Sequence, residues 1–139
     1  MAQQFSVAVR NARLDAIEQA IGASPKLRLY SGDQPANCAA ARTGVVVVEF
    51  ALSTDWMAQA ANGSKGFSGT LSGVGAAAAG DGTDIGHFAI MDSAGITCHH
   101  QGKVGITGDA TADLTVDNLS LAQGQAISIT GFALTDGNA

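Results

Sequence analysis

After Pro25, turn-forming residues interrupt this chain repeatedly, and the apolar runs between them are short. Gly, Pro, Asp and Ser cluster at residues 31–35 and 92–95, as is typical of turns. Between such clusters, β-branched residues are frequent or apolar residues alternate with polar ones, which is typical of strands. Roughly seven or eight short strands, spaced about ten residues apart, predict a mainly β, single-domain antiparallel β-sandwich or jelly roll. The main expected strands are residues 26–30, 45–52, 67–72, 85–91, 96–106, 113–116 and 127–134.

Residues 6–22 form the only stretch with convincing helical periodicity. Ser6 is placed to cap the N-terminus, and Gly22 followed by Pro25 is a typical stop signal. We expect this helix to pack across one open side or end of the sandwich through an apolar stripe. The stripe consists of Val7, Leu14, Ile17 and Ile21, of which we expect the last three to be buried.

Several local features refine this expectation. Residues 45–52 are the strongest apolar run, and their consecutive valines favour a central strand covered on both faces. Residues 53–61 favour a short helical turn, and residues 73–82 a low-complexity loop. From Ile85 the pattern predicts a β meander that begins with a hairpin around an Asp-Ser-Ala-Gly turn. The apolar phase flips at Gly131, which predicts a bulge there.

The chain has 139 residues, enough for one domain with a two-layer core. Hydrophobic residues make up 46% of it but aromatic residues only 5%, so the core side chains are small and each buries little area. We therefore expect modest stability for the isolated chain, and a homo-oligomer (a dimer or trimer) or docking on a larger body that supplies further burial. The expected parts are an N-terminal tail, a helix, a β-rich body and a C-terminal tail, at residues 1–5, 6–22, 26–135 and 136–139.

The net charge of −5 and the lack of a basic run make DNA or RNA binding a poor fit. No apolar stretch approaches the length of a membrane span, and the first residues lack the pattern of a signal peptide. With only two cysteines, Cys38 and Cys98, the chain is not a disulfide scaffold, and synthesis in a reducing compartment fits. We expect a protein partner, with no nucleic acid and no membrane.

The histidines are the first candidates for catalysis or metal binding, because His87, His99 and His100 fall in the predicted hairpin near Cys98. Two aligned strands would bring His87 near His99 or Cys98. However, His99 and His100 alternate to opposite faces, and no metal-ligand spacing is present. A nucleophile elbow and a complete glycine-rich dinucleotide motif are also lacking. We predict no catalytic residue, no metal and no cofactor, and a protein that is not an enzyme.

The chain resembles small structural proteins of tailed bacteriophages over most of its length. The resemblance begins with the runs at residues 10–18 and 21–28. Its motifs are structural, and no catalytic residue is carried over. The further matching segments are Gly32, residues 35–38, residues 39–41, Asp55-Trp56, residues 92–99 and Gly131-Phe132.

Proteins of this kind are capsid cement (decoration) proteins, similar to a jelly-roll cement protein on the head of a Bordetella phage. The resemblance implies a virion protein, made in the host cytoplasm, that sits on the outer capsid surface and bridges major capsid protein subunits. The alternative is a phage tail component, such as a β-sandwich module that binds a receptor or carbohydrate. Few aromatic residues are present for stacking on a sugar, since Trp56 and Tyr30 alone make a thin platform, which disfavours that alternative.

Chain ends and exposed sheet edges are natural contact elements in such a protein, because an edge can extend a neighbour's sheet. Arg10 and Arg13 of the predicted helix are candidates for contact with a partner, and the alternative is that both form ion pairs with Asp15 and Glu18 of the same helix. The candidate partner-contact residues are Gln3, Gln4, Arg10, Arg13 and Asp136.

Overall fold

The structure is a computed structural model and describes residues 3–137. It is a mainly β domain with an N-terminal helix, α1 (Val7–Ile21), which confirms the predicted fold class. The remaining elements are β1 (Lys26–Ser31), β2 (Val46–Ala51), β3 (Ser64–Lys65), β4 (Ser72–Val74), the 3-10 helix η1 (Ala77–Ala79), β5 (Thr83–Met91), β6 (Cys98–Ile106), β7 (Leu114–Val116), β8 (Ser120–Leu121), β9 (Ala126–Phe132) and β10 (Leu134–Thr135).

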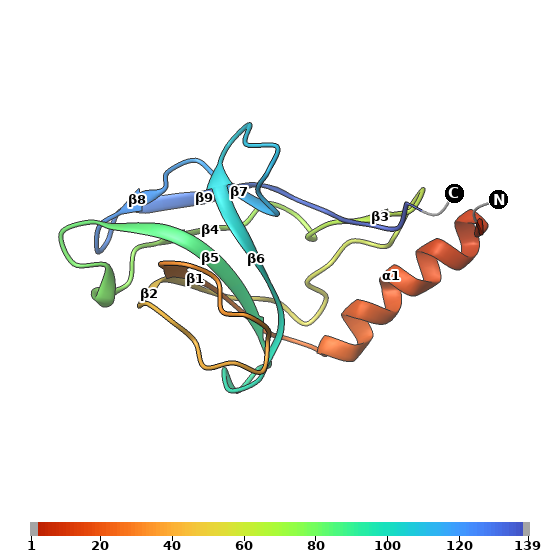
Figure 1. The fold of residues 1–139 in the computed structure, drawn as a ribbon, viewed down its shortest axis with the longest axis horizontal. Helices are drawn as coiled ribbons and strands as arrows, with labels where there is room; N and C mark the ends of the chain where they lie inside the picture. Colours follow the sequence, from red (N-terminus) through yellow and green to blue (C-terminus); the bar gives the residue numbers. More distant parts are fainter. Residues whose placement is uncertain (1–2, 138–139) are drawn as a thin grey trace.

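The main sheet follows the strand order β2-β1-β5-β6-β7-β9-β4, and β8 pairs with the first residues of β5. Its two ends approach each other, since the Ala76 N–H, just after β4, donates to the Val47 carbonyl in β2 at 2.7 Å. The sheet therefore curls into a nearly closed sandwich, with β1, β2 and β5 in one layer and β7, β8 and β9 in the other (Figure 1). A separate two-stranded sheet joins β3 and β10.

Side chains that face inward from alternate strand positions fill the sandwich. Leu27 and Leu29 of β1 are completely buried, and so is Phe88 of β5. Phe88 packs edge-on against Phe132 of β9, with ring centroids 5.8 Å apart. Because side chains alternate with a period of two, this buried set fixes the register of each strand.

The predicted hairpin of β5 and β6 is confirmed. The Gly95 N–H donates to the Asp92 carbonyl at 2.9 Å, and Gly95 has a φ of 73°, which glycine adopts without strain. The expected meander, however, is wrong beyond β6, because β7 pairs parallel to β6, with Leu114 opposite Val104. A tight loop brings the chain back along β6, held where the Asp113 carboxylate accepts from the Lys103 N–H at 2.9 Å.

The predicted bulge in the last long strand is also confirmed. Thr115 of β7 pairs with Gly131, but Val116 pairs with Ile129, so Thr130 is the extra residue on β9. A Cβ at Gly131 would lie 2.7 Å from the Thr115 hydroxyl oxygen, which explains a glycine at this point.

The valine-rich strand β2 is not the central strand that the sequence predicts. It lies at one end of the strand path and pairs with β1 only. Val47 and Val48 are nevertheless both completely buried, because η1 and β4 pack against the strand where a further neighbour would lie. The charged Glu49 points to solvent and pairs with Arg28, at 2.7 Å from Nε to the carboxylate.

Two further local predictions are wrong. Residues 53–61 form no helical turn but an extended segment in which Trp56 and Met57 are buried. Of the predicted strand at residues 67–72, only Ser72 lies in a strand, because β4 begins there and continues into the predicted loop at residues 73–82, while Phe67 forms a single bridge with Met57. Large side chains of both segments pack against the core, and backbone hydrogen bonds join the two: the Ala58 N–H donates to the Gly66 carbonyl at 2.9 Å, and the Ser68 N–H to the Trp56 carbonyl at 3.0 Å.

A smaller apolar cluster lies on the opposite face of β1 and β5 from the main core. Tyr30, Ala89 and Met91 are buried there, with Val46 and Cys98 packed against them. These residues alternate along the strands with core residues, so the loop at residues 32–45 has an apolar surface on which to lie. The loop connects β1 to β2.

Candidate functional site

Helix α1 projects from the β layers and lies beside β3 and β10 at one end of the molecule (Figure 1). Its ends are as predicted: the Ser6 hydroxyl accepts from the Val9 N–H at 3.3 Å, and Gly22 follows the last turn with a φ of 94°. The indole N–H of Trp56 donates to the Gly22 carbonyl at 3.0 Å and so ties the C-terminus of the helix to the body.

The predicted packing of the helix through its aliphatic stripe is correct for Leu14 and in part for Ile21, but it is wrong for Ile17. Leu14 is the one helix residue that is buried, and Ile21 is partly buried against the core. Ile17 is 37% exposed and Val7 is 45% exposed. The short sheet of β3 and β10 offers little apolar surface, so the helix instead turns a mostly polar face toward the body.

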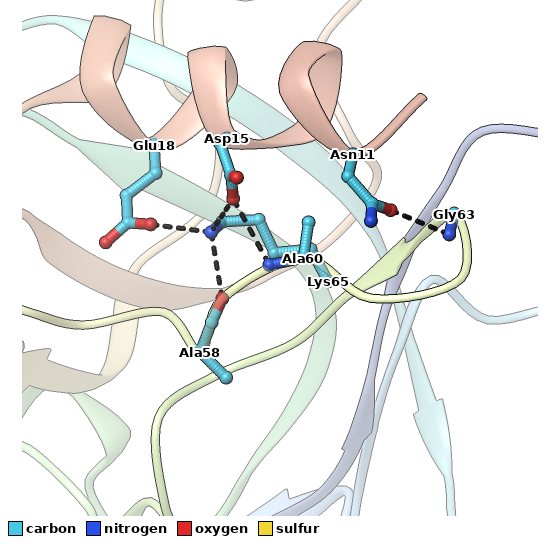
Figure 2. Close-up of polar contacts among 7 residues, drawn as sticks. All are labelled: Asn11, Asp15, Glu18, Ala58, Ala60, Gly63 and Lys65. Atoms are coloured by element: carbon cyan, nitrogen blue, oxygen red, sulfur yellow. Dashed lines mark hydrogen bonds and ion pairs between the residues drawn. The ribbon is translucent and has the colours of Figure 1, made fainter. Parts of the chain in front are cut away.

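The central contact of this polar face is a lysine clamp, formed by Lys65 of β3 with Asp15 and Glu18 of α1 (Figure 2). The Lys65 ammonium lies 2.7 Å from a carboxylate oxygen of each, and it donates to the Ala58 carbonyl at 2.8 Å. Asp15 also accepts from the Ala60 N–H at 3.2 Å. The Lys65 side chain is 1% exposed, so these acceptors replace water for a buried cation.

The clamp shifts the pKa values of its members. Burial of the Lys65 ammonium opposes its charge, but its hydrogen bonds to Asp15 and Glu18 and the attraction of their charges together outweigh burial, so the pKa of Lys65 is raised above its ordinary 10.5. The hydrogen bond from Lys65 and the one from the Ala60 N–H lower the pKa of Asp15 below 3.8. Both shifts favour the charged forms, which hold the helix in place.

A second set of polar contacts lies one turn toward the helix N-terminus. The Asn11 side-chain oxygen accepts from the Gly63 N–H at 2.9 Å (Figure 2). Gly63 has a φ of 73°, and a Cβ there would lie 2.3 Å from a guanidinium nitrogen of Arg10. The turn before β3 therefore needs a glycine both for its backbone conformation and for the approach of the helix.

The C-terminal segment completes the contact. Arg10 donates to the Asp136 carbonyl at 3.1 Å, and Arg13 pairs with the Asp136 carboxylate, also at 3.1 Å. The Asp136 N–H donates to the Gly63 carbonyl at 2.9 Å. Helix, β3 turn and C-terminal segment thus form one connected structure from parts that are far apart in the sequence.

The side of α1 that faces away from the body is apolar. We call this side, made of Val9, Ala12, Ala16, Ile17 and Ala20, the outer helix face, and all five residues are exposed. Val9, Ala12, Ala16 and Ala20 recur at helical spacing and form one strip, which Ile17 borders on the side of the C-terminal segment. The helix therefore does not separate its residues as an ordinary amphipathic surface helix does: Leu14 and Ile21 pack against the body beside polar groups, while other apolar residues lie in solvent.

A groove of about 420 Å³ runs beside this strip, between α1 and the C-terminal segment. It is lined by Ile17 from the outer helix face and by the Arg13–Asp136 ion pair. The Arg13 side chain is 49% exposed, and its guanidinium carbon lies 4.6 Å from the ring centroid of Phe5. A charged pair next to exposed aliphatic residues is suited to binding another protein surface.

The structure brings three of the five predicted contact residues together, namely Arg10, Arg13 and Asp136. Gln3 and Gln4 are exposed before the helix. The alternative in which the arginines pair within their own helix is wrong, because Asp15 and Glu18 are bonded to Lys65 instead. Residues 138–139 of the predicted C-terminal tail and residues 1–2 of the N-terminal tail lie outside the described residues.

Sequence reasoning missed Lys65, which is the centre of the contact. The residue stands in a polar, glycine-containing stretch, and nothing in that stretch indicates burial. The one available signal was on the helix, where Asp15 and Glu18 lie three residues apart on one side without a basic residue at matching spacing. Two carboxylates so placed repel each other weakly, and a cation from elsewhere in the fold can bind both.

The histidines do not form a site. His87 is completely buried and stacks on Tyr30, with centroids 5.1 Å apart, whereas His99 is exposed. His100 lies on the core side against Phe88, and burial lowers its pKa. Within residues 3–137, no group of three His, Cys, Asp or Glu side chains is arranged to hold a metal ion. In the same part of the chain, no helix is long and apolar enough to cross a membrane.

No protein family, curated protein or solved structure matches this chain.

Proposed function

We propose that this protein is a structural component of a tailed-phage virion, a cement protein that binds the outer surface of the capsid and bridges major capsid protein subunits. The resemblance of its sequence to small phage structural proteins suggests the setting. The observation that carries the proposal is the outer helix face of α1, whose apolar residues are exposed beside the groove at the C-terminal segment.

The arrangement suits attachment to a large assembly. A projecting helix can enter a depression between neighbouring subunits while the compact β body stays outside. Val9 is 43% exposed and Ile17 is 37% exposed, so their burial in such a contact would contribute to binding. Because one small helix face supplies limited area, tight binding requires several copies acting together, as in a dimer or trimer on a symmetric capsid.

A receptor- or carbohydrate-binding role is less well supported. Sugar binding in β-sandwich modules relies on aromatic rings presented to solvent. Trp56 is 2% exposed and Tyr30 is 4% exposed, and both pack within apolar clusters. Neither ring is available as a stacking platform.

Cosedimentation with undecorated capsids of the phage that encodes this chain tests the proposal. We expect the wild-type protein to sediment with capsids, and we expect Val9→Asp and Ile17→Asp to weaken binding by about tenfold or more. Ile96→Asp is the matched control, since Ile96 is 80% exposed in the β5–β6 turn, on another part of the molecule. Circular dichroism of all variants verifies that each is folded.

Failure of the wild-type protein to sediment with capsids, together with its retention on host cells, would refute the cement role and favour the tail alternative. Equal weakening by all three substitutions would instead show that the outer helix face is not the contact surface.

A further inference from the structure

The loop at residues 32–45 is fastened to strand β6 by a reciprocal pair of side-chain hydrogen bonds. The amide nitrogen of Gln101 donates to the Pro35 carbonyl at 2.9 Å, and its amide oxygen accepts from Arg42 at 2.8 Å. Gln101 faces the same side of the sheet as Ala89, with which it is paired. The loop is therefore held across the outer apolar cluster and reaches the hairpin of β5 and β6 (Figure 1).

This docking places the two cysteines of the chain beside each other. Cys38 of the loop and Cys98 at the start of β6 line the same cavity, of about 520 Å³, together with Arg42 and Met91. The Cys98 thiol donates to the His100 carbonyl at 3.6 Å, and Cys38 lies near enough to contribute to the raised pKa of Cys98. Both cysteines are free and half-buried.

We propose that Cys38 and Cys98 form a reversible intramolecular disulfide when the protein meets a small-molecule disulfide such as oxidised glutathione. The inference goes beyond the proposed function and stands independently of it. Fixed placement favours the internal bond over mixed disulfides, because the folded chain holds both cysteines at the lining of one cavity.

The exchange proceeds in two steps. A thiolate of the protein attacks oxidised glutathione, forms a mixed disulfide and releases one glutathione thiolate. The second cysteine thiolate then attacks the protein sulfur of the mixed disulfide and releases the other glutathione. The two cysteine thiols lose two protons and two electrons in total, and oxidised glutathione takes these up as two molecules of glutathione.

The surroundings of the two sulfurs indicate which one reacts first. Desolvation and the nearby Cys38 raise the pKa of the Cys98 thiol to about 11, so it is seldom a thiolate at neutral pH. The first attack therefore starts from Cys38. Cys98 then loses its proton as the second attack closes the bond.

The disulfide would change how the loop at residues 32–45 is attached to the sheet. In the reduced protein, the loop is held by hydrogen bonds and by contacts with the outer apolar cluster, whereas the bond between Cys38 and Cys98 would fix it covalently to β6. The closed ring runs from Cys38 to Cys98 and includes β2 to β5. A ring of this length restricts the unfolded chain strongly, which predicts a melting temperature higher by about 10 °C in the oxidised form.

The test incubates the full chain, under native conditions, with oxidised glutathione in mildly alkaline buffer, followed by non-reducing digestion and mass spectrometry. We expect a Cys38–Cys98 peptide pair, loss of both titratable thiols, a monomer on non-reducing gels, and the rise in melting temperature. The single variants Cys38→Ser and Cys98→Ser should each gain one glutathione instead, and the adduct should form faster in Cys98→Ser.

Two outcomes would overturn the proposal: wild-type protein that carries two glutathione adducts or crosslinks between chains, and thiols that stay unreacted although they react in the urea-unfolded chain. An internal disulfide without a rise in melting temperature would overturn the inference that the bond fastens the loop to the folded sheet.

Discussion

Replacement of Lys65 by methionine tests whether the lysine clamp holds α1 to the β body. Methionine keeps most of the apolar stem and removes the ammonium, which has two carboxylate acceptors at 2.7 Å and a carbonyl acceptor at 2.8 Å. Hydrogen bonds that involve a charged group contribute roughly 1.5–3 kcal/mol each, while burial of an ammonium group costs several kcal/mol. The acceptors Asp15 and Glu18 are 37% and 22% exposed, so water replaces the lost partner in part.

The balance of these contributions predicts that Lys65→Met lowers the free energy of unfolding by about 1–3 kcal/mol. Urea denaturation followed by circular dichroism measures this loss. Amide hydrogen exchange locates it, because the helix contacts the body mainly through β3, and its amides should lose protection before those of β5. Lys26→Met is the matched control. Lys26 lies 4.0 Å from Glu49 with a side chain 32% exposed, and its loss should cost at most about 0.5 kcal/mol.

The reasoning is refuted if Lys65→Met unfolds at the wild-type urea midpoint and its helix amides exchange at the wild-type rate. In that case the aliphatic contacts of the helix, rather than the buried ion pairs, would hold it in place. A loss of protection spread evenly over helix and sheet would equally contradict the inference that the clamp acts locally.

Three further measurements follow from the same region. The folded-state pKa of Asp15 lies below its unfolded value of about 3.8. Its stabilising contribution is therefore present above that pH and is lost as the pH falls through the folded-state pKa. Acid titration should destabilise wild type more steeply than Lys65→Met between about pH 5 and pH 2. Gly63→Ala should cost about 1–3 kcal/mol by urea denaturation, and more than Gly69→Ala, since both glycines have a positive φ but a Cβ at Gly69 meets nothing within 4 Å. Trp56→Phe keeps an aromatic ring in the core but removes the indole donor to the helix C-terminus, so a loss of about 1 kcal/mol in thermal or urea unfolding is expected, and an unchanged midpoint would contradict it.

The sequence predicts those features that depend on neighbouring residues. The helix limits follow from Ser6 and Gly22, the β5–β6 hairpin from its turn residues, and the bulge from the change of phase at Gly131. For the helix ends and the hairpin, the interacting residues lie within a few positions of each other along the chain. For the bulge, the pattern of apolar and polar residues changes at the position where the backbone has an extra residue. Such local signals are present in the sequence whatever the rest of the fold does.

Features that depend on distant partners could not be predicted in the same way. The parallel pairing of β7 with β6 depends on the path of the intervening loop, and the position of β2 depends on what packs at its free edge. The candidate site is the clearest example, because helical periodicity identified the stripe with Ile17 but not the surface that the helix meets. That surface presents the buried ammonium of Lys65, so Asp15 and Glu18 dock on the body together with Leu14.

Of the predicted contact residues, the proximity of Arg10 and Arg13 to Asp136 could not be derived from spacing, since the pairs join opposite parts of the chain. Their selection from the sequence was based on position near the chain ends and on charge. The structure gives these residues internal partners, and the exposed surface next to them consists of small apolar residues that charge patterning does not identify.

The dependence of α1 on Asp136 has a consequence for the order of folding. The helix is synthesised well before the C-terminal segment that its arginines bind and before the strand β10 that pairs with β3. Contacts that close so long a stretch of chain form slowly, and a helix of this length is marginal in water without them. We therefore expect the β sandwich to form before the helix is fixed. A folding intermediate would then expose both faces of α1, and premature association through that helix would be the main hazard at high expression levels.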